Sequence, residues 1–294
     1  MSDKIPVILD TDIGSDIDDT WALAMMLKSP ELDVKLVVTD TGNTTYRAKV
    51  TAKMLEAGGR TDVPVGIGIN FSDKVGRQGP WVEEYDLSNY PGTVHEDGVD
   101  ALIQTIMNSP EPVTLICIGP VPNIGAALKH EPRIVENARF VGMHGSIKLG
   151  YGGSEKISAE CNVVNHTPDC QKAFTADWDM TITPLDTCGL VHLSGEKYRS
   201  VYECNDPLIR AMIENYRVWA KYSPKSQQRS STLFDTVAVY LAFSEELLVM
   251  EKLGIRVTDD GYTVIDENAK SINCAMEWGD LGAFEDFLVK RLTS

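Results

Sequence analysis

Five aspartates lie within ten positions near the start of the chain, in the segment VILDTDIGSDIDDTWALAMML at residues 7–27. They are Asp10, Asp12, Asp16, Asp18 and Asp19. One or two such acids could simply cap a helix, because a helix N-terminus favours negative charge. Five carboxylates held together raise one another's pKa unless a cation or strong donors offset the repulsion. The crowding therefore favours a metal site of the oxygen-rich kind that suits Ca²⁺ or Mg²⁺.

Two known classes of acidic motif fit this segment incompletely. An EF-hand counted from Asp10 needs Gly at its sixth position and Glu at its twelfth, which are Ser15 and Trp21 here, so that interpretation fails. A Mg²⁺-dependent phosphoaspartyl phosphatase also begins with a strand followed by D-x-D, and Asp10 would then be its nucleophile. Gly14 stands where that class needs Thr or Val. The phosphatase remains an alternative.

The elements that must position these acids follow a β-α alternation. Short β-branched runs alternate with segments of helical period, and helices are expected at about residues 18–28 and 45–56. This pattern predicts an α/β fold with an open, mostly parallel, doubly wound sheet. From about residue 194 the pattern becomes mainly helical, with DPLIRAMIENYRVWAKY as the longest helix and a strand pair near LGIRVTDDGYTVID. No linker or repeat interrupts the chain, so we expect a single domain over residues 1–294.

Three polar stretches are candidate functional loops. They cover residues 70–96, 145–166 and 222–231. Loops of the length of the first two are uncommon inside compact α/β domains unless they serve binding or catalysis.

The amino-acid composition limits the classes of molecule that this protein is expected to bind. Lys and Arg number 27 against 43 Asp and Glu, and the net charge of -16 argues against nucleic acid or an anionic membrane. No apolar run approaches the ~20 residues that cross a bilayer. The N-terminal MSDKIPVILD has an acid beside its single lysine and no small-residue cleavage site, so a secretory signal is not expected and a cytoplasmic location is. Six cysteines without C-x-x-C spacing indicate reduced thiols.

The segment DTDIGSDIDDTWAL resembles the signature of the nucleoside hydrolase family, the inosine/uridine-preferring N-ribohydrolases, in a longer variant with two extra residues before the Asp pair. The resemblance extends to TGNTTYRAKVTAKML, TLICIGPVPNIGAALKHEPRIVENARFVGMHG, AECNVVNHTPDCQKAF and LFDTVAVYLA. It implies a Rossmann-like nucleoside hydrolase fold and Ca²⁺-dependent hydrolysis of N-glycosidic bonds in ribonucleosides or related ribosyl compounds. It also implies a homodimer or homotetramer. A sugar-processing relative with a non-nucleoside substrate is a further alternative.

Residue roles follow from the same resemblance. It implies Ca²⁺ ligation by Asp12, Asp19, Asp235 and the main-chain carbonyl of Ile118, with Asp12 also accepting a proton from the attacking water. The implied substrate contacts are Asp18, Asn43, Met143, Glu160 and Asn162. Several of these residues directly follow predicted strands, and open parallel sheets bind ligands at the carboxyl ends of their strands.

The sequence departs from the family pattern at a residue that would act on the departing base. Many members carry a histidine immediately before the last metal aspartate, but Phe234 stands there in this chain. Some purine-preferring members have an aromatic residue at that position and stack the base between rings. We therefore expect Phe234 to contact the base, with Trp81 as the second ring. His144 is the candidate general acid.

Overall fold

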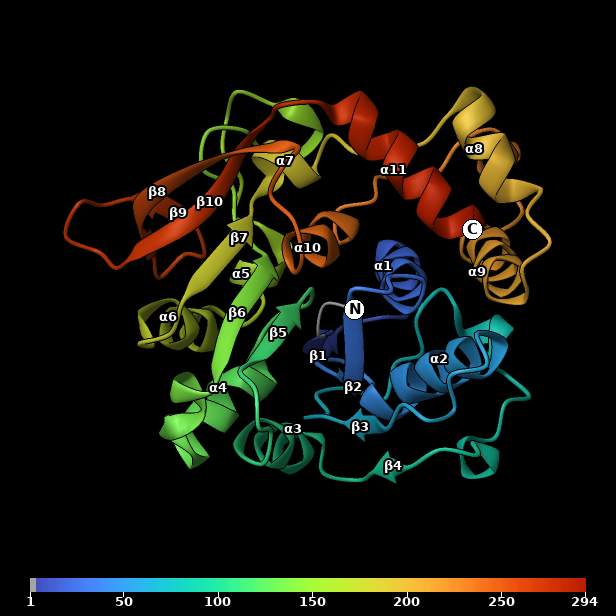
Figure 1. The fold of residues 1–294 in the computed structure, drawn as a ribbon, viewed down its shortest axis with the longest axis horizontal. Helices are drawn as coiled ribbons and strands as arrows, with labels where there is room; N and C mark the ends of the chain where they lie inside the picture. Colours follow the sequence, from blue (N-terminus) through green and yellow to red (C-terminus); the bar gives the residue numbers. More distant parts are fainter. Residues whose placement is uncertain (1–3) are drawn as a thin grey trace.

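A ten-stranded sheet forms the centre of the computed structural model, which describes residues 4–294. The strand order is β4-β3-β2-β1-β5-β6-β7-β10-β8-β9 (Figure 1). All neighbouring strands are parallel except the pairs β10–β8 and β8–β9. The strands are β1 Ile5–Thr11, β2 Leu32–Thr39, β3 Val65–Ile67, β4 Val94–His95, β5 Val113–Cys117, β6 Ala138–Met143, β7 Met180–Thr183, β8 Leu248–Val257, β9 Thr263–Ile265 and β10 Ser271–Trp278.

Helices cover both faces of the sheet, which confirms the predicted doubly wound α/β fold (Figure 1). One face carries α1, α2, α9, α10 and α11, and the other carries α3, α4 and α6. No helix among residues 4–294 is long and apolar enough to cross a membrane. The helices are α1 Asp18–Leu27, α2 Thr44–Ala57, α3 Gly98–Met107, α4 Pro122–His130, α5 Cys161–Val164, α6 Thr167–Thr175, α7 Leu185–Cys188, α8 Gly195–Tyr202, α9 Pro207–Trp219, α10 Thr236–Leu241 and α11 Leu281–Thr293.

Strand β1 is buried on both faces. Val7 and Leu9 pack into the core beside α1, while Ile8 packs into the core beside α3 and α4. A strand of a parallel sheet that is covered on both sides must be apolar at successive positions, which explains the uninterrupted run VIL. The polar residues begin with Asp10 and Thr11, the last two residues of β1.

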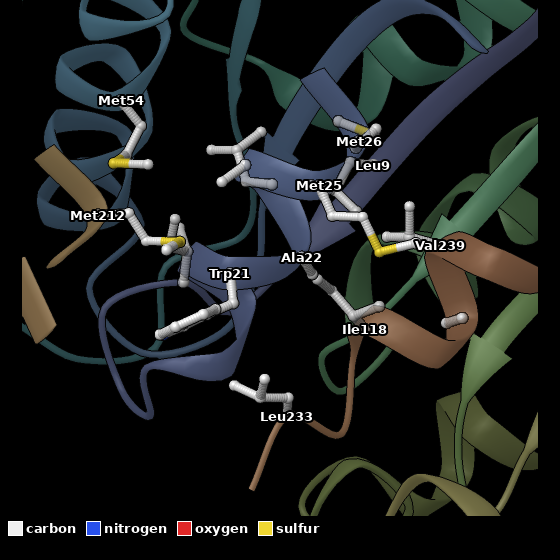
Figure 2. Close-up of a cluster of buried hydrophobic side chains, with 14 of the residues drawn as sticks. Leu9, Trp21, Ala22, Met25, Met26, Met54, Ile118, Met212, Leu233 and Val239 are labelled. Atoms are coloured by element: carbon white, nitrogen blue, oxygen red, sulfur yellow. The ribbon is translucent and has the colours of Figure 1, made fainter. Parts of the chain in front are cut away.

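Helix α1 is buried almost all round (Figure 2). Met54 of α2, Met212 of α9 and Val239 of α10 surround it. The ring of Trp21 packs against Tyr198 and Tyr216, with centroids 6.4 and 6.1 Å away. A helix enclosed on every side cannot shift easily, so the first turn of α1 occupies a fixed place in the molecule.

The C-terminal part differs from the sequence-based expectation. The predicted strand pair exists as β8 and β9, but β10 was not predicted and joins the sheet between β7 and β8. The helix predicted to be longest is α9, with 13 residues, whereas α2 has 14. The six cysteines are free, as expected.

Candidate active site

A pocket of about 100 Å³ lies where β1, β5 and β6 end, the edge at which ligand binding was expected. Its walls come from the β1–α1 loop, the ends of β5 and β6, the 145–166 loop and the start of α10. The lining residues are Asp12, Ser15, Asp16, Asp18, Asp19, Ile118, Met143, Tyr151, Glu160, Cys161, Asn162, Phe234 and Asp235. The structure therefore brings most of the predicted site residues together from distant parts of the chain.

Three buried carboxylates converge on one side of this pocket. Oxygens of Asp18, Asp19 and Asp235 all lie within 4.8 Å of one another, and each residue is at most 5% exposed. The hydroxyl of Thr11 donates to Asp19 Oδ1 over 2.6 Å and fixes the orientation of that group. This clustering fits a cation site better than helix capping, because neither Asp18 nor Asp19 caps α1.

The same crowding disturbs the ionisation of these acids. Burial raises the pKa of Asp18, Asp19 and Asp235 well above the ordinary value, and repulsion from neighbouring carboxylates adds to the effect. A divalent cation would reverse this balance, because it stabilises the ionised form of every ligand around it.

Asp12 lies beside this cluster and has different partners. Ser15 Oγ donates to Asp12 Oδ2 over 2.6 Å, and Arg47 Nη2 lies 3.6 Å from the same oxygen. The side chain of Asp12 is 18% exposed, so it is the most accessible of the predicted metal acids. Its carboxylate can therefore meet water at the mouth of the pocket.

Glu160 and Asn162 form the opposite wall. Asn162 Nδ2 donates to the carbonyls of Ile118 and Met143 over 3.1 and 3.0 Å, which ties the ends of β5 and β6 together. The carboxylate of Glu160 accepts from the backbone nitrogens of Gly145 and Asn162. Burial nevertheless raises the pKa of Glu160 to about 7. This wall therefore offers polar groups to the pocket.

An acid that the sequence did not single out anchors the loop that carries this wall. The buried carboxylate of Asp186 accepts from the backbone nitrogens of Ile147, Lys148 and Leu149. Three amide groups that donate to one carboxylate resemble an N-cap. Asp186 is far in sequence from these three amides, so no local sequence pattern could reveal the contact.

Two aromatic rings form the outer rim. Phe234 meets Tyr151 edge to face, with centroids 6.1 Å apart. The hydroxyl of Tyr151 accepts from the backbone nitrogen of Cys161, and the Tyr151 side chain is 44% exposed. Tyr151 was not predicted as a site residue, although it lies in the candidate functional loop at residues 145–166. The rings present apolar faces to a pocket whose floor is polar.

Three predicted site residues, Asn43, Trp81 and His144, do not line this pocket. Asn43 caps α2, accepting from Tyr46 N, and its amide group donates to the carbonyl of Asp73. The indole of Trp81 donates to Glu214 on α9 and lies under the ammonium of Lys53. The proposed stacking of Trp81 on the base therefore has no support from its position.

His144 also lies outside the pocket, although Met143 next to it lines the wall. Its ring is completely buried and packs against Phe140 and Phe174. Burial lowers the pKa of His144 to about 3, so the ring is neutral near pH 7. This placement gives no support to the expectation that His144 is the general acid.

Asp10 is buried beneath the site. It is 0% exposed, and its Oδ2 accepts from Asn123 Nδ2 over 2.8 Å. A phosphoaspartyl phosphatase needs its first aspartate exposed to an incoming phosphate, so this position argues against the phosphatase alternative.

Comparisons with known proteins agree with this geometry. Residues 7–284 match the family model described as inosine-uridine preferring nucleoside hydrolase. A pyrimidine-specific ribonucleoside hydrolase, RihA from Salmonella arizonae, is 33% identical, and the alignment covers 98% of each chain. A probable uridine nucleosidase 2 of Arabidopsis thaliana is 24% identical and covers 95% of this chain and 91% of its own.

Solved structures share the fold. A plant nucleoside hydrolase, PpNRh1, superposes with a TM-score of 0.83 at 21% identity, covering 99% of this chain and 100% of its own. A purine-preferring ribonucleoside hydrolase from Gardnerella vaginalis gives a TM-score of 0.79 at 20% identity and covers 98% of each chain. With an acidic pocket at the strand ends and a family match over nearly its whole length, the chain belongs to the inosine-uridine preferring nucleoside hydrolases and is an N-glycoside hydrolase of the nucleoside type.

Proposed function

We propose that this protein hydrolyses the N-glycosidic bond of ribonucleosides at the acidic pocket, with Ca²⁺ held by Asp12, Asp19 and Asp235 and by the carbonyl of Ile118. The observation that carries the proposal is the convergence of Asp18, Asp19 and Asp235 within 4.8 Å, beside Asp12, in one pocket. Carboxylate and carbonyl oxygens are the ligands that calcium prefers. Bound calcium would orient the attacking water and the sugar hydroxyls.

The chain's own residues account for the remaining steps. Asp12 accepts a proton from the attacking water as the new C1′–O bond forms and the C1′–N bond breaks. The electron pair of the broken bond leaves with the base, whose nitrogen takes up a proton from solvent. Asp18, Glu160 and Asn162 hold the ribose hydroxyls, and nearby carboxylates stabilise positive charge on the sugar ring.

The leaving base lies against the aromatic rim in this proposal. Phe234 cannot donate a proton, and the pocket offers no histidine within its described lining. Stacking against Phe234 favours a large ring, so purine ribosides are the preferred substrates. The names of the relatives include both base preferences, since one relative is pyrimidine-specific and another is purine-preferring.

A substrate panel tests the proposal. Purified protein in Ca²⁺ is incubated with inosine, adenosine, uridine, other ribosides and a phosphate monoester, and free base, free ribose and phosphate are measured. The proposal predicts equal amounts of base and ribose from at least one ribonucleoside and no release of phosphate. Hydrolysis of only non-nucleoside glycosides would favour the sugar-processing relative instead.

Three broader expectations are also part of the proposal. We expect the chain to form one domain, to assemble as a homodimer or homotetramer, and to act in the cytoplasm. Light scattering on the eluted protein measures its subunit number directly.

A further inference from the structure

The loop between β1 and α1 is held through its backbone in an unusual way. Four consecutive carbonyls, those of residues 13–16, each accept a hydrogen bond from a long side chain. The donors are Arg47 Nη1 to Ile13 O at 2.9 Å, Tyr46 Oη to Gly14 O at 3.0 Å, Trp219 Nε1 to Ser15 O at 3.2 Å, and Gln78 Nε2 to Asp16 O at 2.6 Å. We call these four donors the carbonyl clamp.

The clamp draws on three separate parts of the chain. Tyr46 and Arg47 belong to the first turn of α2, Gln78 to the 70–96 loop, and Trp219 is the last residue of α9. Since none of these parts is adjacent in sequence to the β1–α1 loop, the arrangement fixes the loop against the body of the protein.

The donors are themselves held in place. Gln78 is completely buried, and its Oε1 accepts from Asn215 Nδ2 at 2.6 Å and from Thr20 Oγ1 at 3.2 Å. Arg47 is 7% exposed and also donates to the carbonyl of Thr41 at 2.9 Å. A donor with a fixed orientation restricts its acceptor far more than a mobile surface side chain would.

The 70–96 loop also lies directly against the clamped backbone. A Cβ atom added at Gly76 would fall 2.3 Å from the carbonyl oxygen of Gly14, so only glycine fits there. Gly14 itself has φ +106°, a conformation that L side chains rarely adopt. The loop is therefore held in one conformation by close packing as well as by hydrogen bonds.

The place of the clamp in the sequence explains why it matters. Compared with the family signature, this loop contains two extra residues. A longer loop can adopt more conformations. Asp12 immediately precedes the clamped residues, and Asp18 and Asp19 follow them closely. Any movement of the loop would change the separation between these acids.

We propose that Tyr46, Arg47, Gln78 and Trp219 are positioning residues, which hold the lengthened β1–α1 loop so that Asp12 and Asp19 meet at the pocket. All four contact the backbone of the loop, and Arg47 also lies 3.6 Å from the carboxylate of Asp12. The inference depends on the proposed roles of Asp12 and Asp19 in the hydrolysis.

Single-atom or single-ring changes test the clamp with matched controls. Tyr46→Phe removes only the hydroxyl, and Tyr90→Phe is its control, because both tyrosines are 6% exposed and donate to a backbone carbonyl. Trp219→Phe removes the indole donor, and Trp278→Phe is its control, because Trp278 is also half-buried and donates to the carbonyl of Thr187 at 2.9 Å. The control residues lie away from the pocket.

Three quantities are measured on each variant. These are the exchange of backbone amides at residues 13–17 with deuterium, the Kd for CaCl₂ by calorimetry, and kcat/KM on a ribonucleoside that the wild type hydrolyses. We expect Tyr46→Phe and Trp219→Phe to exchange faster at residues 13–17, to bind Ca²⁺ about 10-fold more weakly and to lose about 10-fold or more in kcat/KM, which corresponds to ~1.4 kcal/mol. The controls should show the same loss of Tm and none of these local effects.

The outcomes separate this inference from the proposed function. Exchange at residues 13–17 no faster than in the controls would overturn the clamp, whatever the activity. Faster exchange with unchanged Ca²⁺ affinity and unchanged kcat/KM would overturn its positioning role. A wild-type protein that hydrolyses no ribonucleoside would instead refute the proposed function, and the clamp would still be decided by exchange and Ca²⁺ binding.

Discussion

Replacing Glu160 with glutamine should reduce the pH dependence of stability in the metal-free protein. Glu160 is 1% exposed, and burial raises its pKa from 4.5 in a freely solvated chain to about 7. Between these two pH values the folded protein holds a proton that the unfolded chain has released. The free energy of unfolding therefore falls as the pH rises through this window, and it is constant below about 4.5 and above about 7 with respect to this group.

The size of the effect follows from the difference between the two pKa values. It corresponds to roughly 3 kcal/mol at 1.36 kcal/mol per pH unit. Since 1 kcal/mol moves the Tm of a large domain by roughly 2 °C, Glu160 accounts for roughly 6 °C of the pH-dependent loss. Glutamine cannot ionise, so the variant should lack this part of the slope.

The assay is thermal unfolding in a chelator at several pH values from about 4.5 to about 8. Both carboxylate oxygens of Glu160 accept backbone hydrogen bonds, and one of these bonds is lost in glutamine. The cost of that lost bond is independent of pH. The prediction therefore concerns the slope of Tm against pH and not the absolute Tm. Glu155→Gln, an exposed acid in the same loop, is the control. Parallel Tm curves for wild type and Glu160→Gln would refute the reasoning.

Three further predictions concern metal, sugar and base. Asp235→Ala should lose most of its bound Ca²⁺ and its activity while keeping its fold, because it removes one of the converging carboxylates; wild-type calcium content in elemental analysis of the variant would contradict the site. A 2′-deoxyribosyl substrate should leave Asp18 without a partner, at about 1–3 kcal/mol, so kcat/KM falls by about 5- to 150-fold. Equal values for both sugars would contradict recognition through the 2′-hydroxyl. Phe234→Ala should lower kcat on purine ribosides by about 10-fold, whereas His144→Ala should leave the pH profile of kcat unchanged, because His144 is neutral and outside the pocket. Efficient uridine hydrolysis by Phe234→Ala would show that stacking does not activate the leaving base.

The parts of the fold that local pattern determines were predictable. The first helix was expected at about residues 18–28 and is Asp18–Leu27, because an apolar helical period and acids at its start mark it clearly. Strand β10 was not predicted, since its role depends on pairing with β7, which lies about 90 residues earlier. Short apolar segments such as SINCAMEW do not reveal that pairing on their own.

The sequence predicted where the site lies in the fold better than it predicted the directions of the individual side chains. Residues that follow parallel strands were bound to lie at one edge of the sheet, which placed Asp12, Ile118 and Met143 correctly. Met143 ends β6 and His144 directly follows it, and side chains alternate between the two faces along this segment. Met143 therefore reaches the pocket while His144 packs against Phe140 on the other face. The position of Trp81 in a long loop had no periodicity to indicate where its ring would point.

Hydrolysis of inosine by Asp12→Asn tests the central claim most directly, because asparagine keeps the shape of the side chain but cannot accept the proton from water. The measurement is the rate of free base release in saturating Ca²⁺, with Tm as the check on folding. The proposed role of Asp12 predicts a loss of about 100- to 10,000-fold relative to wild type. A folded Asp12→Asn variant that releases base at the wild-type rate would contradict it.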